Sequence, residues 1–178
     1  MTEIQREFAY AKAQGWLPLF AQAGSLYNFT PALLMGIASR ETNMKNIQGD
    51  FQGGIYHGYG LMQIDIGSYP DFCRSGDWRD VAKGIHMGAM VLNSKQVQIH
   101  EGVGRRIEVK STVFTGAKLS DADFNRTAVA AYNAGLWAYY GMSVRGNPDL
   151  YTTGHDYSAD VINRTKQFAD CLAAEKVA

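Results

Sequence analysis

Cysteine and net charge are both scarce in this chain of 178 residues. Two cysteines are too few for a disulfide framework, and their separation excludes a CxxC metal or redox motif. Cys73 and Cys171 therefore either form one bridge between mid-chain and the last helix, or remain two buried thiols. Lys plus Arg and Asp plus Glu both total 17. Because duplex nucleic acid is bound through surplus positive charge, this balance argues against a nucleic-acid partner.

Long apolar runs and regular ligand spacings are also missing. No run reaches the roughly 18 apolar residues of a membrane span, so we expect no membrane partner. The residues after Met1 lack the apolar core of a signal peptide, so the protein is either cytosolic or has lost a leader. The four histidines share no ligand spacing, so we expect no metal and no cofactor.

Apolar and aromatic residues are plentiful enough for one folded domain. Hydrophobic residues make up 46% and charged residues 19%, which excludes a disordered chain and a coiled coil. The length predicts a single domain spanning 1–178. Ten Tyr, eight Phe and three Trp in a neutral chain suit a neutral, ring-shaped ligand, although the Tyr139-Tyr140 pair is expected in the core.

The hydrophobic periodicity predicts a mainly α-helical protein of the α+β class. A glycine-rich stretch at 49–67 indicates loops and a small irregular sheet, and 141–150 reads as a Gly, Asn and Pro-rich link. A β-hairpin arm is expected at 105–115, within a charged insertion at about 98–118. Helices are expected over 3–14, 16–28, 31–43, 77–98, 121–133 and 156–175.

Glu41 is the most informative residue of the predicted third helix. Leu34, Ile37 and Ala38 precede it by seven, four and three positions, so they share its helix face. Partial burial on an apolar face disfavours the ionised carboxylate and should raise the pKa of Glu41. A carboxylic acid still protonated near neutral pH suits general acid catalysis. The alternative is a Glu41 that turns to solvent or pairs with a basic neighbour.

Further polar and glycine residues follow in two segments. The segment Gly58-Tyr59-Gly60-Leu61-Met62-Gln63-Ile64-Asp65 combines glycines, which allow close approach to a ligand, with an amide and a carboxylate. Asp65 and the upstream Asp50 are candidates for the second carboxylate that glycoside hydrolysis requires. An aromatic residue and an amide stand together in Ala131-Tyr132-Asn133-Ala134-Gly135.

Together with Ser39-Arg40-Glu41, these segments resemble the goose-type lysozymes and their lytic transglycosylase relatives. The order of the motifs, the position of Asp65 and the segment His155-Asp156-Tyr157 are closest to the goose type. The resemblance covers roughly 20–172 and implies a lysozyme-like fold with a small β-region beside a catalytic cleft.

The resemblance also implies roles for individual residues. Glu41 corresponds to the catalytic acid and Asp65 to one of two aspartates proposed to hold the attacking water. At the strict spacing of the other aspartate stands Gly54, and Asp50 replaces it only if the loop is realigned. Where the family has a histidine, this chain has Tyr69. The implied sugar-binding residues are Gln63, Tyr59, Met62, Tyr69, Tyr132, Asn133 and Tyr157.

These assignments predict a monomeric muramidase that acts on the cell wall. The expected reaction is hydrolysis of the β-1,4 bond between N-acetylmuramic acid and N-acetylglucosamine in peptidoglycan, with inversion. A lytic transglycosylase, which leaves 1,6-anhydro ends, and a chitinase of the same fold remain alternatives. Outside enzymes, a non-catalytic peptidoglycan- or chitin-binding module remains open.

Overall fold

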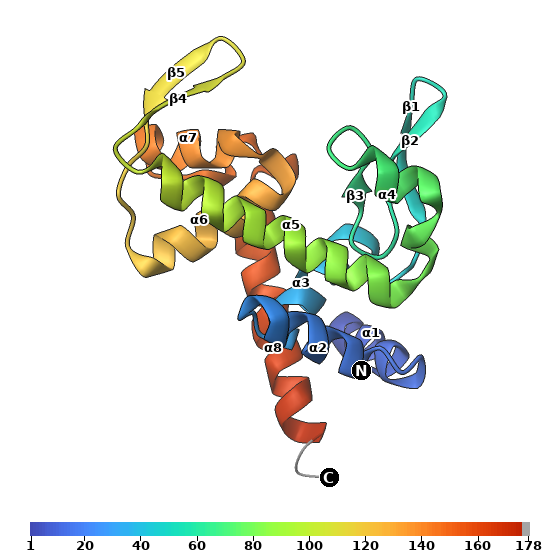
Figure 1. Cartoon of the computed structure of the whole chain (residues 1–178). Helices are drawn as coiled ribbons and strands as arrows, with labels where there is room; N and C mark the ends of the chain where they lie inside the picture. Colours follow the sequence, from blue (N-terminus) through green and yellow to red (C-terminus); the bar gives the residue numbers. More distant parts are fainter. Residues whose placement is uncertain (176–178) are drawn as a thin grey trace. The chain divides into compact units, whose positions relative to one another are not determined.

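The computed structural model describes residues 1–175 and divides into two compact units. The first contains Met1–Met90 and the chain from Asn163 onward, and the second is Val91–Ile162. The predicted class, mainly α-helical with small antiparallel sheets, is confirmed (Figure 1). Two helices, α5 and α8, contribute residues to both units.

The helices of the first unit begin and end at the residues that local chemistry favours. Thr2 and Gln5 form a capping box at the start of α1. Thr30 caps α3 and Pro31 occupies its first position, while Asn43 ends it with a left-handed φ of 50°. The bounds are α1 Glu3–Ala13, α2 Leu17–Tyr27, α3 Pro31–Thr42, α4 Pro70–Ser75, α5 Val81–Gly102 and α8 Tyr157–Glu175.

A three-stranded antiparallel sheet of order β1-β2-β3 lies in the first unit, within the predicted irregular region. Its strands are β1 Gln48–Gln52, β2 Ile55–Tyr59 and β3 Ile64–Asp65. Gly53 and Gly54 join β1 to β2 with φ values of +58° and +84°. Positive φ at both central residues is the geometry of the two-residue hairpin turn, which glycine adopts without strain.

The helix expected over 77–98 is shifted toward the C-terminus. A short 3-10 turn, η1 Asp77–Arg79, ends at Asp80, whose backbone is extended. The Asp80 carboxylate accepts from the Ala82 backbone N–H at 2.9 Å. Asp80, rather than Asp77, therefore supplies the start signal for α5, which runs four residues beyond its expected end.

The second unit contains a helix that the sequence reading missed. Part of the link expected at 141–150 is helical, because α7 runs from Leu136 to Arg145. A glycine and several aromatic and β-branched residues give this segment weak helix propensity, so packing decides it. Gly141 permits that packing, since a Cβ there would meet the Asn147 carbonyl oxygen at 2.6 Å. The other helices are α6 Asp121–Ala134, η2 Pro148–Tyr151 and η3 Thr153–His155.

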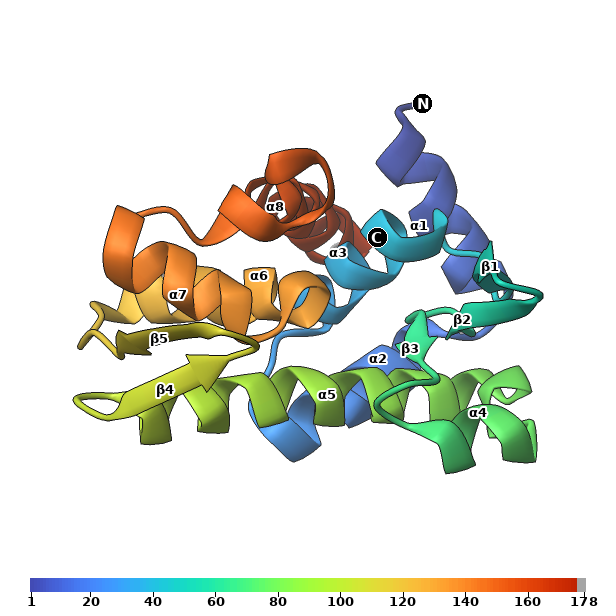
Figure 2. The ribbon, with the colours of Figure 1, turned by 90° about the horizontal axis from the view of Figure 1, so that it is seen from above.

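The predicted hairpin arm is confirmed by β4 Arg106–Val109 and β5 Thr112–Thr115, which pair antiparallel. Figure 2 shows this pair beside α7. Phe114 is buried against the rings of Tyr139 and Tyr140, at centroid distances of 5.7 and 5.4 Å. The Tyr139 hydroxyl also donates to the Ala117 carbonyl at 2.7 Å. The base of the arm therefore belongs to the core of the second unit.

Candidate active site

Glu41 lies in the last turn of α3 and is half-buried. The three residues expected on its face, Leu34, Ile37 and Ala38, are all fully buried. The apolar stripe predicted from the sequence is thus confirmed, and the Glu41 carboxyl is carried at its C-terminal end. The helix that carries Glu41 is capped by Thr30 at its start and by Asn43 at its end.

Two hydrogen bonds attach the end of α3 to the Gly60–Gln63 segment. The Thr42 hydroxyl donates to the Leu61 carbonyl at 3.0 Å, and the Asn46 side chain accepts from the Leu61 N–H at 2.8 Å. Asn46 also donates to the Arg79 carbonyl at 3.1 Å. The backbone of Leu61 is therefore held at its carbonyl by Thr42 and at its N–H by Asn46. These bonds join the segment around Glu41 to the Gly60–Gln63 segment.

Gln63 braces the sheet from within this segment. Its amide nitrogen donates to the carbonyls of Ile47 and Gly60, at 3.0 and 2.9 Å. Its amide oxygen lies against the Cα positions of Gly49 and Gly58, where any Cβ would collide with it. Both amide hydrogens of Gln63 are thus used inside the protein, and the two glycines are required by the close approach.

Asp65 ends β3 and is exposed. One carboxylate oxygen, Oδ2, accepts from the Ser68 backbone N–H at 2.8 Å and from the Ser68 hydroxyl at 2.7 Å. Within residues 1–175, no hydrogen bond is made by the other oxygen, Oδ1. Asp65 therefore ties down the turn that follows it and still presents one oxygen to solvent.

Asp50 lies on β1 in the left-handed backbone region, with φ at +51°, which aspartate tolerates better than most residues. It is exposed, and its Oδ1 accepts from the Gln52 amide at 2.6 Å. Gly49 and Asp65 both pair with Gly58, from opposite sides. The backbones at Gly49 and Asp65 therefore lie two strand spacings apart, about 9–10 Å.

The remaining first-unit candidates differ in their access to solvent. Tyr59 is half-buried, with its ring edge-to-face on Trp78 at 5.8 Å. Tyr69 is also half-buried and caps α4, and its N–H donates to the Asp65 carbonyl at 2.9 Å. Met62, by contrast, is fully buried against Gly88 of α5. Its side chain fills the core and reaches no surface on which a sugar could lie.

Three candidates lie in the second unit. Tyr132 and Asn133 occupy the last turn of α6, where Tyr132 is half-buried and Asn133 is exposed. The Asn133 side-chain oxygen accepts from the Thr153 N–H at 2.8 Å, which attaches η3 to the end of α6. Tyr157 begins α8 and is only 2% exposed, so its ring is mainly a packing element.

Sequence reasoning missed a buried carboxyl that contacts Ser39, two residues before Glu41. Glu7 of α1 accepts from the Ser39 hydroxyl at 2.5 Å, and that hydroxyl accepts from the Arg164 guanidinium at 2.8 Å. Glu7 is 7% exposed, and its second oxygen, Oε1, has no partner among residues 1–175. Burial raises the pKa of Glu7, against the opposing effects of Ser39 and Arg164. The signal was readable, because Glu7 shares the apolar face of Ile4, Phe8 and Ala11.

Both cysteines are free thiols, so the bridge between Cys73 and Cys171 that the sequence left open does not form. Burial, with a smaller contribution from Asp65, raises the pKa of the Cys73 thiol to about 11. Its sulfur lies 3.5 Å from the Ile64 carbonyl. Cys73 therefore acts as a small apolar residue beneath β3.

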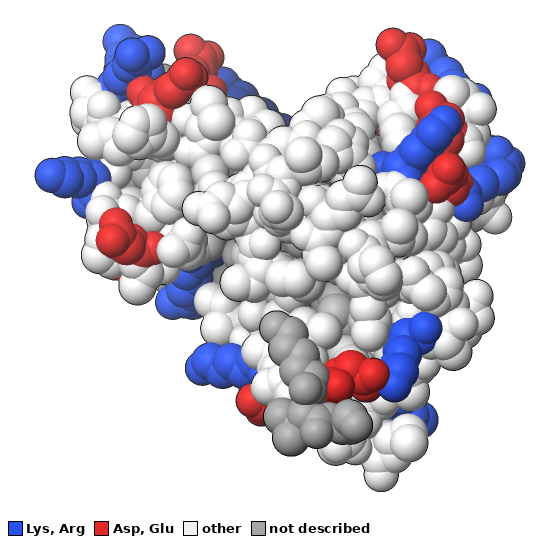
Figure 3. Space-filling view, turned by 60° about the horizontal axis from the view of Figure 1, so that its bottom comes forward, with Lys and Arg blue, Asp and Glu red and all other residues white. Residues whose placement is uncertain are grey.

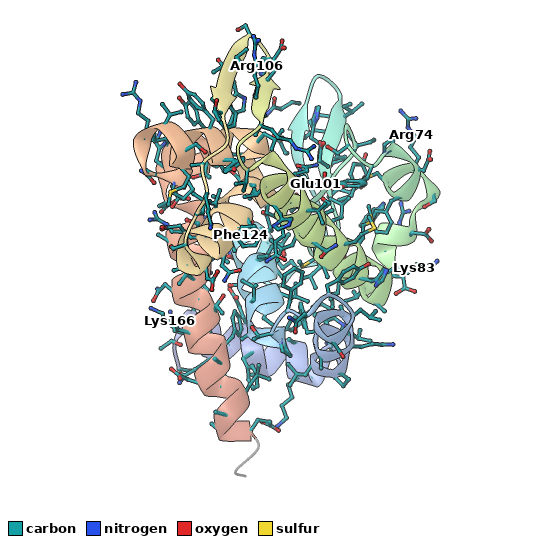
Figure 4. All side chains as sticks on the ribbon, turned by 60° about the vertical axis from the view of Figure 1, so that its left-hand side comes forward. Arg74, Lys83, Glu101, Arg106, Phe124 and Lys166 are labelled. Carbon is teal, nitrogen blue, oxygen red and sulfur yellow. The ribbon has the colours of Figure 1, made fainter. Side chains whose placement is uncertain are left out.

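One apolar cavity of the first unit lies away from the candidate residues. It measures about 390 Å³ and is bounded by α2, α4 and α5 in the first unit. Asp77 and Lys83, which form an ion pair at 2.6 Å, are both among its lining residues. Figure 4 shows the Lys83 side chain near the start of α5. None of its lining residues belongs to the predicted site.

The charged side chains on one face of the molecule are of mixed sign (Figure 3). Figure 3 shows basic and acidic side chains near one another, without a large patch of one sign on the face drawn. No group of three metal-ligating side chains occurs among residues 1–175. No helix in the same residues has the length and hydropathy needed to cross a membrane.

Comparison with known proteins agrees with this geometry. The family model "Lysozyme g" matches residues 9–171. Lysozyme g of Epinephelus coioides is 30% identical over 152 residues, which cover 82% of this chain and 70% of that protein. Lysozyme g of Cyprinus carpio is 25% identical over 162 residues, covering 91% and 77%. The resemblance to goose-type lysozymes is confirmed: the chain belongs to the lysozyme g family and is a glycoside hydrolase of the lysozyme type.

Proposed function

We propose that this lysozyme hydrolyses the β-1,4 bond between N-acetylmuramic acid and N-acetylglucosamine in peptidoglycan, with Glu41 as the general acid. The observation that carries the proposal is the position of Glu41. It is half-buried at the end of the apolar stripe of α3, one residue from the Thr42 hydroxyl that holds the Gly60–Gln63 segment. A partly desolvated carboxyl is suited to hold a proton and pass it to the leaving oxygen.

Asp65 holds the attacking water in this mechanism. Its Oδ2 is engaged by Ser68, which fixes the carboxylate, and Oδ1 is available to accept from water. Attack from the face opposite the leaving group gives inversion at the anomeric carbon. Asp50, on β1 at the other edge of the same three-stranded sheet, is a second water-holding carboxylate in the proposal.

The sugar contacts in the proposal come from exposed and half-buried residues, and each unit is considered by itself. In the first unit, Tyr59 and Tyr69 offer ring faces and hydroxyls. In the second unit, Tyr132 offers a ring and a hydroxyl, and Asn133 offers an amide. Gln63, Met62 and Tyr157 act in the proposal by shaping the backbone and the packing around these contacts.

Glu41→Gln tests the assignment of the acid, because it keeps the shape of the side chain and removes the proton. We expect wall lysis to fall at least about 10²-fold, the usual contribution of a positioned acid. Glu101→Gln, at an exposed position on α5, is the matched control and should lyse at the wild-type rate. Wild-type lysis by Glu41→Gln would refute the assignment.

Asp65→Asn tests the water-holding role. We expect a loss of about 10²–10⁴ in rate with glycan binding largely kept. If Asp65 only ties down its turn, the variant should instead melt at a lower temperature without a specific loss of turnover. Near-full activity would shift the role to Asp50 or to backbone groups.

The second candidate is a lytic transglycosylase, which needs the same acid but no water-holding carboxylate. The observation that favours it is the left-handed hairpin glycine, Gly54, at the strict position of the family's second aspartate. Mass spectrometry of digested peptidoglycan separates the candidates. Hydrated ends would support the hydrolase, and 1,6-anhydro ends would support the transglycosylase. Glycan that remains uncut would support a binding module. Cleavage of chito-oligosaccharides but not of peptidoglycan would indicate a chitinase.

A further inference from the structure

Three aromatic side chains of the second unit form a cluster that the proposed mechanism does not use. Trp137 and Tyr140 stand three positions apart on α7, and therefore share a face. Tyr151 of η2 completes the cluster. The ring centroids are 5.0 Å apart for Trp137–Tyr151, 5.6 Å for Trp137–Tyr140 and 5.7 Å for Tyr140–Tyr151.

The cluster is open to solvent. Tyr151 is 47% exposed, and Trp137 and Tyr140 are half-buried. The other two tryptophans, Trp16 and Trp78, are at most 9% exposed. Tyr139 and Tyr140 were both expected in the core. Tyr139 is fully buried as expected, whereas Tyr140 is only half-buried and belongs to the open cluster. Accessible aromatic rings of this kind mark binding surfaces more often than isolated apolar residues do.

The segment that carries Tyr151 is held firmly. Asp149, in the same 3-10 turn, is 1% exposed and accepts from Ser158 at 2.6 Å and from Arg126 at 3.1 Å. Burial opposes ionisation of Asp149, but these hydrogen bonds outweigh it and lower its pKa. The three rings are therefore pre-positioned, so a ligand that stacks on them pays little ordering entropy.

The cluster is continuous with the segment proposed to contact sugar. Gly135 ends α6 and also begins α7, so Trp137 follows Asn133 by four residues. The hydrogen bond from the Thr153 N–H to Asn133 attaches the other end of the Tyr151 turn to the same place. A glycan chain that contacts Asn133 can continue onto the rings.

The chemistry of the cluster suits the apolar face of a sugar ring. Its rings present apolar faces, and its indole N–H and phenol hydroxyls can hydrogen-bond at their edges. None of its three members is charged. The ring of a β-1,4-linked N-acetyl sugar has an apolar C–H face and a rim of hydroxyl and acetamide groups, which matches this arrangement.

We propose that Trp137, Tyr140 and Tyr151 form a stacking site for an N-acetylated β-1,4-glycan, outside the bond-cleaving residues. The inference rests on the proposed function, because it extends the binding of the same polymer. It gives the second unit a role in holding long chains, which the catalytic motifs do not supply.

The test measures binding without turnover, in a Glu41→Gln background, by calorimetry with chitotetraose and chitohexaose. A parallel arm uses peptide-free oligomers of alternating N-acetylmuramic acid and N-acetylglucosamine, which distinguishes peptidoglycan from chitin as the source of the glycan. Tyr151→Leu keeps an apolar contact for Trp137, and Trp137→Phe keeps a ring while removing the indole. Tyr10→Ala, also at a 47% exposed tyrosine but on α1 of the first unit, is the matched control.

Tyr151→Leu should raise the Kd for the hexamer about 3- to 10-fold, with a smaller effect on the tetramer, as expected for the loss of one stacked ring. Hexamer binding should change the tryptophan fluorescence of the parent, and this change should vanish in Trp137→Phe. Tyr10→Ala should leave both readouts unchanged.

An unchanged hexamer Kd in Tyr151→Leu, with a lowered Tm, would overturn the inference and leave the cluster as packing. If the hexamer Kd is unchanged in Tyr151→Leu but the enzyme with Glu41 intact lyses cell walls normally, the proposed function would remain intact. If hexamer binding depends on the rings but the enzyme with Glu41 intact cleaves neither peptidoglycan nor chitin, the stacking site would be supported and the proposed hydrolase refuted. The two failures are therefore distinguishable.

Discussion

The hydroxyl of Thr42 donates to the backbone carbonyl of Leu61 at 3.0 Å, and so joins the turn after Glu41 to the Gly60–Gln63 segment. The same hydroxyl lies 3.0 Å from the Ala38 carbonyl, within α3. Thr42 is 7% exposed, so water cannot replace these contacts. One side chain therefore couples two motifs that are nearly twenty residues apart in sequence.

Thr42→Val should lower both stability and activity. The substitution keeps the shape but leaves the Leu61 carbonyl without its buried donor, at a cost of about 1–3 kcal/mol. Because the loss loosens the Gly60–Gln63 segment that leads to Asp65, kcat should fall more than KM changes. Urea unfolding and lysis kinetics measure the two effects. Thr115→Val, at an exposed β5 position, should change stability by less than about 0.5 kcal/mol.

Glu7→Gln should remove a pH dependence from the stability of the protein. Burial raises the pKa of Glu7 in the folded state, so the carboxyl contributes most below its unfolded pKa, and this contribution is lost as pH rises through the folded pKa. Glutamine keeps an acceptor for Ser39 and carries no charge. The stability of Glu7→Gln relative to wild type should therefore increase as pH rises above the unfolded pKa of glutamate, about 4.3.

Urea unfolding at several pH values checks this slope. Other groups near Glu7 are Glu3, Arg6 and Arg164, and they are unchanged in the variant. Glu101→Gln, at an exposed position, should run parallel to wild type across the range. A stability difference between Glu7→Gln and wild type that does not vary with pH would contradict the prediction.

The thiols should react one at a time. Cys171 is half-buried and Cys73 is buried with a pKa of about 11, so a thiol reagent at pH 8 should modify Cys171 first in the folded protein. Both thiols should react in urea, and reducing agent should leave the Tm unchanged. Cys171→Ser should remove the fast phase. A single urea-exposed thiol, or a Tm lowered by reductant, would contradict the free-thiol assignment.

Phe114→Ala should destabilise the second unit by about 3–5 kcal/mol, the usual cost of removing a buried phenylalanine ring. Phe114 is 6% exposed, whereas its neighbour Val113 is 43% exposed on the other face of β5. Val113→Ala is therefore a matched control and should change stability by less than about 0.5 kcal/mol. Equal small effects for both would show that the arm is only a surface addition.

Local signals were sufficient for most elements that begin or end with a strong cap. The helix of Glu41 could be predicted because Thr30 and Pro31 start it and because its apolar residues repeat on one face. The hairpin arm was readable from alternation alone, and β4 and β5 bear it out. The buried Glu7 was also readable, since it interrupts an apolar helix face.

Segments without strong local signals were decided by packing. The α7 helix contains a glycine, three aromatic residues and the β-branched Val144, and Gly141 permits its packing because it leaves room for the Asn147 carbonyl. Met62 belongs to the Gly-Leu-Met-Gln motif, yet its contact with Gly88 of α5 places it in the core. Neither contact can be read from residues adjacent in sequence.

The sequence by itself was enough to propose two carboxyls for the chemistry: Glu41 at the end of an apolar helix face, and Asp65, which follows the Gly60–Gln63 segment. Helix periodicity pointed to Glu41, because its apolar face depends on neighbours within two turns, whereas the resemblance to goose-type lysozymes suggested the role of Asp65. Only the tertiary structure decided that the Gln63 amide braces the sheet, that the Asp65 carboxylate holds Ser68 with one oxygen, and that Tyr140 leaves the core to join Trp137 and Tyr151. These outcomes depend on distances between segments remote in sequence or on which of several hydrogen-bond partners a side chain finds, and composition and spacing do not encode either.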